Sequence, residues 1–437
     1  MQNFKFKPEA EARARHALDL DEKDFRATIL LAEAVDPAEG IQLLQDTAKT
    51  LEVDTKFTAN DFNRKELARL LHTLGMLHWR QEQYDQTVTV CLRALTFDIT
   101  DYYRVFSVFQ IYARKHRWED MIDALEVIRQ HSTEEHNLGE MLQTFAEVPD
   151  IHALFHGLVR RTERIDLVGA IYEAAISRLD NTEAYSQLSN IRCAYGETLY
   201  GIRDRRAEAI KQWEQAIQQD LPRGNDHHIL QDLISKLAPI YVDRARREDD
   251  PTAHLEQLRS LVPDSVSDTA SFVDPQIYLA RYWYSRGNHV EAKQMVREIL
   301  QQAIDLLSDE DVGNDAFAFQ RLISVFVPLG DQKNTDVCVR MLARIGGMIM
   351  CDGDCGESWN FGDAMWWCRD CVNVNFNGAC YQKLCRGEFN FTACHRGHEF
   401  FYMKVDEEMA KGEDPKTAGF DQNWIEGIRR EYLVAQD

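Results

Sequence analysis

The feature that most constrains the fold is a helical pattern that repeats within residues 1–345. Apolar residues recur there at spacings of three and four, for example at Leu67, Leu70, Leu71, Leu74 and Leu77. This spacing places them on one face of an α-helix. We expect one helix to end near Trp79 and a second to run from Tyr84 through Ala94. Trp118 follows Tyr84 by 34 residues and opens a similar stretch, so the pattern predicts successive pairs of helices.

Two later stretches have similar small and large apolar positions. One is IRCAYGETLYGIRDRRAEAIKQWEQAIQQDLP, with Ala209, Trp213, Ala216 and Pro222. The other is QIYLARYWYSRGNHVEAKQMVREILQQAIDL, with Leu279, Ala280, Trp283, Gly287, Ala292 and Ile299. In the first unit, the small residue Gly75 lets the paired helix approach closely. The spacing and this pattern of residue sizes resemble the tetratricopeptide repeat.

The resemblance implies a mostly α fold in which residues 1–345 form a right-handed α–α superhelix. It also implies a surface that binds an extended peptide or another helix. The residues themselves support stacking, because each pair of helices has an apolar face that is too wide to bury alone. A plain helical bundle, in which the repeated pattern reflects packing only, stays open as the alternative.

Seven of the ten cysteines lie in the 53 residues from 351 to 403. The other three, Cys91, Cys193 and Cys338, fall in apolar helical stripes, where cysteine is a small core residue. The spacings in the cluster are Cys351-x3-Cys355, Cys368-x2-Cys371, Cys380-x4-Cys385 and Cys394-x3-His398. Such pairs are typical of tetrahedral zinc sites. Disulfides are disfavoured because no signal peptide is visible, and no Cys/His arrangement singles out a catalytic thiol.

The stretch CRDCVNVNFNGAC and the ending CHRGHEFFYM resemble a ZZ-type zinc finger, of the kind that follows helical repeats in some fungal proteins. That family binds two zinc ions in a cross-brace, in which alternate pairs of ligands share a metal. Carried over to this chain, the resemblance implies one site formed by Cys368, Cys371, Cys394 and His398. The other site would use Cys351, Cys355 and Cys380 with a fourth ligand. One or two Zn²⁺ ions are therefore expected.

The chain departs from the family pattern at the fourth ligand of the second site. Asn377 stands where a cysteine is expected, three residues before Cys380, and an amide is a poor zinc ligand. Cys385 and His395 are alternative candidates. However, five residues of regular helix rotate Cys385 by about 140° from Cys380, so sharing one metal would need a break in the helix.

In the ZZ family, acidic residues often hold the free N-terminal amine of a peptide. The corresponding positions here are Asn373 and Asn375, which are uncharged. The acids that remain near the metal ligands are Asp352, Asp354, Asp363 and Asp370. We expect the zinc to be structural, with peptide binding by the finger as the alternative. The aromatic residues expected to pack around it are Trp359, Phe361, Trp366, Trp367, Phe376, Phe400 and Phe401.

The charge balance indicates the class of partner. Asp and Glu total 72 against 50 Lys and Arg, a formal net charge of −22. Such a surface repels phosphate backbones and anionic lipid and favours basic partners. No stretch approaches the 18 apolar residues of a membrane span, and the first residues contain no apolar leader core. We expect a protein or peptide partner, no nucleic acid and no membrane, and a cytoplasmic or nuclear location.

The sequence contains no G-x-x-x-x-G-K-[ST] loop, no G-x-S-x-G elbow and no H-E-x-x-H motif. We therefore predict no catalytic and no cofactor-binding residues, and interpret the chain as a non-catalytic scaffold for other proteins. Two alternatives stay open. One is a zinc-dependent adaptor that resembles a ubiquitin ligase of the RING type, and the other is the sensor part of a larger repeat-containing receptor.

Composition divides the chain into three parts. We expect a repeat domain over 1–345, a zinc-binding domain over 346–403 and a tail over 404–437. In the tail, one helical face carries Trp424, Ile425, Ile428, Tyr432 and Leu433. The simplest role for that helix is to cap the finger or the repeats. Loss of zinc is expected to unfold the finger alone, because the three parts are taken as separate modules.

Overall fold

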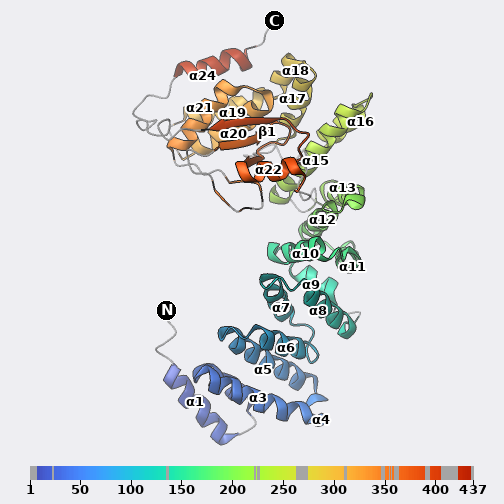
Figure 1. Cartoon of the computed structure of the whole chain (residues 1–437), viewed down its shortest axis with the longest axis vertical. Helices are drawn as coiled ribbons and strands as arrows, with labels where there is room; N and C mark the ends of the chain where they lie inside the picture. The colour runs from blue at the N-terminus through green and yellow to red at the C-terminus, as the bar shows by residue number, and fades with distance from the viewer. Residues whose placement is uncertain are drawn as a thin grey trace. The chain divides into compact units, whose positions relative to one another are not determined.

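A computed structural model of the chain (Figure 1) describes residues 7–21, 24–133, 137–220, 223, 227–261, 274–309, 313–345, 350–353, 355, 357–358, 364–388, 394–404 and 422–434. These residues are mostly helical, as predicted, and include a small three-stranded sheet near the C-terminal end. The contacts divide the chain into two compact units, Met1–Thr198 and Leu199–Asp437. Four residues singled out in the finger, Asp354, Trp359, Phe361 and Asp363, lie outside the described residues, as does Pro222.

The first unit consists of consecutive helices. They are α1 (Lys7–Leu20), α2 (Phe25–Ala34), α3 (Pro37–Val53), α4 (Thr55–Thr58), α5 (Asp61–Arg80), α6 (Tyr84–Leu95), α7 (Tyr102–Arg114), α8 (Trp118–His131), α9 (Leu138–Thr144), α10 (Pro149–Thr162), α11 (Ile165–Leu179) and most of α12 (Tyr185–Tyr200). Neighbours in sequence pack together, for instance α2 on α3 and α5 on α6. Side-chain oxygens cap several N-termini, among them those of Asp24, Asp36 and Asn60.

The pair α5 and α6 shows why the sequence folds into helical hairpins. The predicted limits agree with the structure, in which α5 ends at Arg80 and α6 begins at Tyr84. A Cβ atom added at Gly75 would lie 2.7 Å from Cys91 Sγ, so the glycine does allow close approach. Cys91 is buried, and burial raises its thiol pKa to about 12. Cys193 and Cys338 are buried too, as expected for core residues.

The second unit adds further helices and the sheet. After α12 come η2 (Arg203–Arg205), α13 (Arg206–Gln215), η3 (Ala216–Asp220), α15 (His227–Arg247), α16 (Thr252–Arg259), α17 (Pro275–Ser285), α18 (His289–Met295), α19 (Arg297–Ser308), α20 (Asp315–Leu329) and α21 (Gln332–Arg344). The helix predicted after Gly287 is interrupted at Val296, so α18 and α19 are separate. The large side chain of Trp213 and the small one of Ala292 are buried, as their pattern predicted.

One turn geometry recurs in four helical hairpins. A residue with positive φ follows the first helix in each, namely Glu82 (59°), His116 (56°), Gly287 (80°) and Gly330 (68°). The next residue then donates its N–H to the carbonyl five residues earlier, at distances of 2.9, 2.9, 3.0 and 3.0 Å. This hydrogen bond is the one that closes a Schellman motif. The second helix starts directly afterwards at Tyr84, Trp118, His289 and Gln332, so the repeated sequence pattern corresponds to a repeated turn.

The sheet lies between the cysteine-bearing loops. It consists of β1 (Ala364–Cys368), β2 (Asn375–Asn377) and β3 (Phe400–Lys404), in the antiparallel order β2-β1-β3. Helix α22 (Gly378–Arg386) follows β2 directly. Trp366 of β1 stacks on Tyr381 of α22, with ring centroids 5.0 Å apart. Phe376 is fully buried among the cysteines, so the core of this part is small and rich in sulfur.

The tail ends in α24 (Gln422–Ile428) and η4 (Arg429–Leu433), where the sequence predicted a helix. Ile425, Ile428 and Tyr432 are buried. Tyr432 donates its hydroxyl to Asp331 Oδ2 at 2.6 Å, and Trp424 donates Nε1–H to Asn334 Oδ1 at 2.8 Å. The tail helix therefore packs on the helical part of the second unit, which is one of the two capping positions expected.

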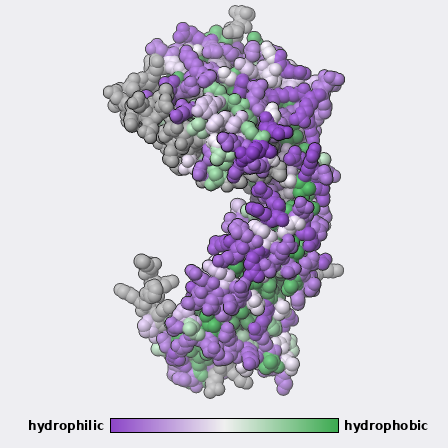
Figure 2. All heavy atoms as spheres, viewed as in Figure 1, coloured by the Kyte–Doolittle hydropathy of each residue, from purple (hydrophilic) through white to green (hydrophobic). Residues whose placement is uncertain are grey.

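Hydrophilic residues cover most of the face shown in Figure 2, in keeping with the acidic composition. Within the described residues, every helix is too short or too polar to cross a bilayer.

Candidate metal centres

The structure brings all seven predicted ligands together in two groups. The four-ligand cluster consists of Cys368, Cys371, Cys394 and His398, and the three-cysteine cluster of Cys351, Cys355 and Cys380. Within each group the ligand atoms all lie within 4.8 Å of one another, so each group could hold a metal ion. The two groups interleave along the chain, which is the cross-braced arrangement that the resemblance implied. Cys385 and His395 belong to neither group.

The four-ligand cluster is built on the end of β1 and the turn that follows it. The backbone N–H of Cys371 donates to Cys368 Sγ at 3.2 Å, and the N–H of Cys368 donates to the carbonyl of Val374 at 2.8 Å. Asn373 closes this turn with a φ of 61°, a backbone conformation that asparagine tolerates better than most residues. The turn thus points both thiols to one side while hydrogen bonds hold their spacing.

Cys394 and His398 come from the segment that leads into β3. All four ligand residues are at most 7% exposed, so the cluster is closed to solvent. His398 Nδ1 lies 3.5 Å from Cys368 Sγ and 3.3 Å from Cys371 Sγ. Its other ring nitrogen, Nε2, lies 3.3 Å from Oδ2 of Asp243 in α15. A carboxylate in this position orients a ligating imidazole and fixes which nitrogen faces the metal.

Asp243 holds a second histidine as well. His395 Nε2 lies 2.8 Å from the same Oδ2 atom, and the rings of His395 and His398 are 3.9 Å apart. His395 is therefore placed next to the four-ligand cluster and away from the fourth position of the other one. Sequence reasoning had named His395 as a candidate ligand and had missed Asp243, which is 155 residues before His398.

The electrostatics of the four-ligand cluster favour positive charge at its centre. Burial lowers the pKa of His398, but the Asp243 carboxylate and the Cys368 thiolate outweigh burial and raise the pKa to about 10. Burial raises the pKa of Cys368, yet hydrogen bonds with Cys371, Cys394 and His398 bring it well below its usual value. A metal cation would supply this charge and would displace the protons on binding.

Asp370, inside the turn between Cys368 and Cys371, ties the cluster to the helices. It is buried and lies 2.8 Å from both Arg281 Nε of α17 and Arg246 Nη1 of α15. Its other oxygen accepts the backbone N–H of Glu399 at 2.7 Å. Burial raises the pKa of Asp370, but Arg281 and Arg246 outweigh this effect and lower it. This acid is therefore engaged in packing and not available to hold a peptide amine.

Further contacts join the same turn to α17 and α20. The hydroxyl of Tyr278, which is fully buried, accepts the N–H of Val372 at 3.3 Å. Arg369 Nε donates to the carbonyl of Val327 at 3.3 Å, and Arg369 also pairs with Glu399 at 2.9 Å. The metal-ligand turns and the helices of the second unit thus form one continuous hydrogen-bonded structure.

In the three-cysteine cluster, backbone amides point at the sulfur atoms. Gly353 and Asn377 donate their N–H groups to Cys351 Sγ at 3.4 and 3.3 Å, and Glu357 donates to Cys355 Sγ at 3.5 Å. A Cβ atom at Gly353 would lie 2.4 Å from Cys380 Sγ, so only glycine fits there. These donors are the ones that stabilise thiolates rather than thiols.

Asn377 takes part in this cluster without supplying a ligand atom. Its Oδ1 accepts the N–H of Cys380 at 2.7 Å and so caps α22, while its Nδ2 donates to Cys355 Sγ at 3.4 Å. Cys385 lies on the exposed side of α22, away from the cluster, as the 140° rotation of a regular helix predicted.

No protein-family model matches the chain, and no curated protein matches its sequence.

Proposed function

We propose that the chain is a non-catalytic adaptor that binds another protein through helical repeats and carries a zinc-stabilised module at its C-terminal end. The observation that carries this proposal is the closed four-ligand cluster. Structural zinc sites have four protein ligands, whereas catalytic sites keep one position open. Here the four donor atoms are buried, and the second nitrogen of His398 is engaged by Asp243.

The donor set supports zinc as the metal. Three thiolates and one imidazole are ligands that zinc prefers, and hard ions such as Mg²⁺ and Ca²⁺ prefer oxygen. Zinc–sulfur and zinc–nitrogen bonds of about 2.3 and 2.0 Å give a tetrahedron whose S···N edges are about 3.5 Å. The two distances from His398 Nδ1 to the sulfurs, 3.5 and 3.3 Å, fit that geometry.

The recurring turn supports the repeat interpretation. Glu82 and His116 lie 34 residues apart at equivalent positions of two hairpins, each with positive φ and the same hydrogen bond. We infer that hairpins of this kind stack into a superhelix similar to that of tetratricopeptide repeats. With a net charge of −22, a basic peptide or helix is the partner that such a surface favours.

Two measurements on the untagged full-length chain test the proposal. The first compares labelled random peptides of net positive and net negative charge by fluorescence anisotropy, with salt varied. We expect saturable binding of basic peptides that weakens with salt, and equal binding of both pools would contradict the inferred partner class. The second measures transfer of ubiquitin in a reconstituted assay. Self-modification that is lost in Cys368→Ser would overturn the non-catalytic adaptor in favour of a ligase.

A further inference from the structure

We propose that the three-cysteine cluster is an open metal site whose fourth position takes a neutral nitrogen donor, such as the imidazole of a partner's histidine. The inference rests on the proposed binding of zinc by this module and goes beyond the structural role of the four-ligand cluster.

The count of donors leaves one position open. Among the residues that the structure describes, only the thiols of Cys351, Cys355 and Cys380 meet within 4.8 Å in this cluster. The position from which a fourth ligand would come is held by Asn377, whose Nδ2 donates to Cys355 Sγ at 3.4 Å and to Glu357 Oε2 at 2.8 Å. An amide N–H has no lone pair to offer a metal. Three protein ligands with an exchangeable fourth define an open zinc site.

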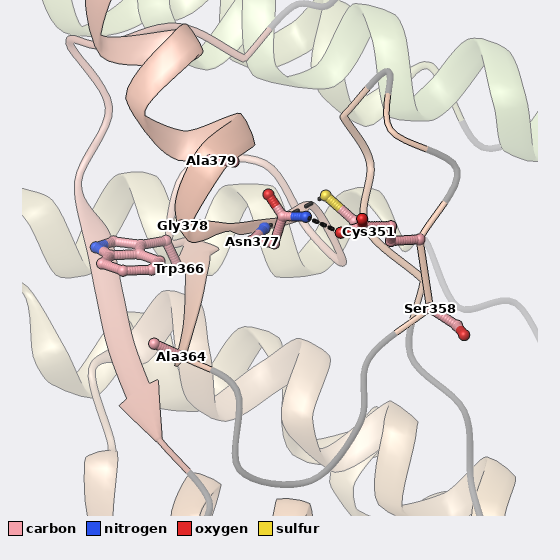
Figure 3. Close-up of a pocket in the computed structure, with 8 residues that line it drawn as sticks. Cys351, Ser358, Ala364, Trp366, Asn377, Gly378 and Ala379 are labelled. Atoms are coloured by element: carbon pink, nitrogen blue, oxygen red, sulfur yellow. Dashed lines mark hydrogen bonds between the residues drawn. The ribbon is translucent and has the colours of Figure 1, made fainter.

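A pocket of about 340 Å³ lies beside this cluster (Figure 3). Cys351 and Asn377 form one side of it, and Trp366 another. The indole of Trp366 is held flat by its stack on Tyr381, with ring planes 10° apart. The four-ligand cluster is closed by burial, whereas this cluster has a path for a small molecule or side chain to approach.

Charge decides which donor fits. Three thiolates around a divalent cation leave a net charge of −1, and the Glu357 carboxylate at the pocket adds another negative charge. An anionic fourth ligand would be repelled, and a neutral one would not. Imidazole is the neutral nitrogen ligand that zinc binds most often in proteins. The volume of the pocket suits a five-membered ring lying against Trp366 better than a larger ligand.

Cobalt reports on this position directly. The untagged full-length chain is loaded with Co²⁺, and imidazole is titrated in while the visible absorption is followed. We expect a single saturable spectral change that arises from one of two bound cobalt ions. Azide, which is anionic, is expected to have no effect at the same concentrations.

Two substitutions at one position provide matched variants. Asn377→Cys should raise the number of cobalt–thiolate bonds from six to seven per chain, increase the charge-transfer absorption and abolish the response to imidazole. Asn377→Ser keeps a side-chain oxygen that can cap α22 but adds no zinc ligand, so its response to imidazole should match that of the natural chain.

The outcomes separate this inference from the proposed function. Two bound cobalt ions with a spectrum insensitive to imidazole would overturn the open site and leave structural zinc standing. One bound cobalt ion that persists in Cys351→Ser would do the same. A chain that binds no cobalt at all would contradict the proposed function itself.

Discussion

At the scale of single residues, His398 and Asp243 carry the connection between metal chemistry and helical packing. One imidazole nitrogen faces two sulfurs and the other faces a carboxylate from α15. The ligands themselves could be predicted because their spacing is local and typical of zinc. Asp243 could not, since it lies in an arginine-rich helix end, VDRARRED, where a carboxylate looks like ordinary surface charge.

Asp243→Asn is expected to weaken zinc binding at the four-ligand cluster about 10- to 100-fold, because removal of a carboxylate that supports a histidine ligand typically has this cost. Competition with a chromophoric chelator measures the affinity. Asp249→Asn, at an exposed position two turns of sequence later in the same region, serves as the control and should leave affinity unchanged. Equal affinities for the two variants would remove Asp243 from the metal site.

Cys385 separates the two readings of the second cluster. Because it lies on the exposed side of α22, Cys385→Ser should keep the full metal content of the chain. Cys380→Ser should lose the metal of the three-cysteine cluster. Metal content per chain after desalting compares the two variants, and loss of metal in Cys385→Ser would show that the helix breaks to recruit it.

At the scale of elements, helices were predictable and strands were not. The limits of α5 and α6 follow from the positions of apolar residues and the turn between them. The sheet was not expected, because β2 spans three residues and β1 and β3 five each, too short for an alternating pattern to stand out. Its register is set by the loops that gather the cysteines, which local sequence does not encode.

Gly75→Ala should destabilise the first unit although alanine is the better helix former. The new Cβ would lie 2.7 Å from Cys91 Sγ, and overpacking of this kind costs about 1–3 kcal/mol, against a gain of about 1 kcal/mol in helix propensity. Urea unfolding measures the change. Adding Cys91→Ala should recover much of the loss, because it removes the atom in conflict. If the single variant is more stable than the natural chain, the helices do not approach as closely as described.

At the scale of the whole molecule, contacts and composition divide the chain differently. Composition changes after residue 345, which suggested three separate parts. The contacts place the finger in the same unit as the helices from α13 onward. The reason is a set of buried polar contacts, above all those of Asp370 with Arg281 and Arg246. Pairings between residues about 90 or more positions apart leave no local trace in a sequence.

This arrangement changes what loss of metal should do. Chelation is expected to loosen α15 and α17 together with residues 350–404, because the ligand turns hold Asp370 and face Asp243. Hydrogen exchange followed by mass spectrometry, with and without chelator, measures it. Peptides from α5 and α6 provide the internal control and should exchange equally in both states. A change confined to residues 350–404 would instead support the independent finger that composition suggested.

The zinc content of the full-length chain, purified without chelators, tests the central claim most directly. Two closely spaced ligand groups, one closed and one open, predict two zinc ions per chain, with the ion of the four-ligand cluster lost in Cys368→Ser. A natural chain that contains no zinc, while the backbone amides of residues 364–388 stay protected from exchange, would contradict the account.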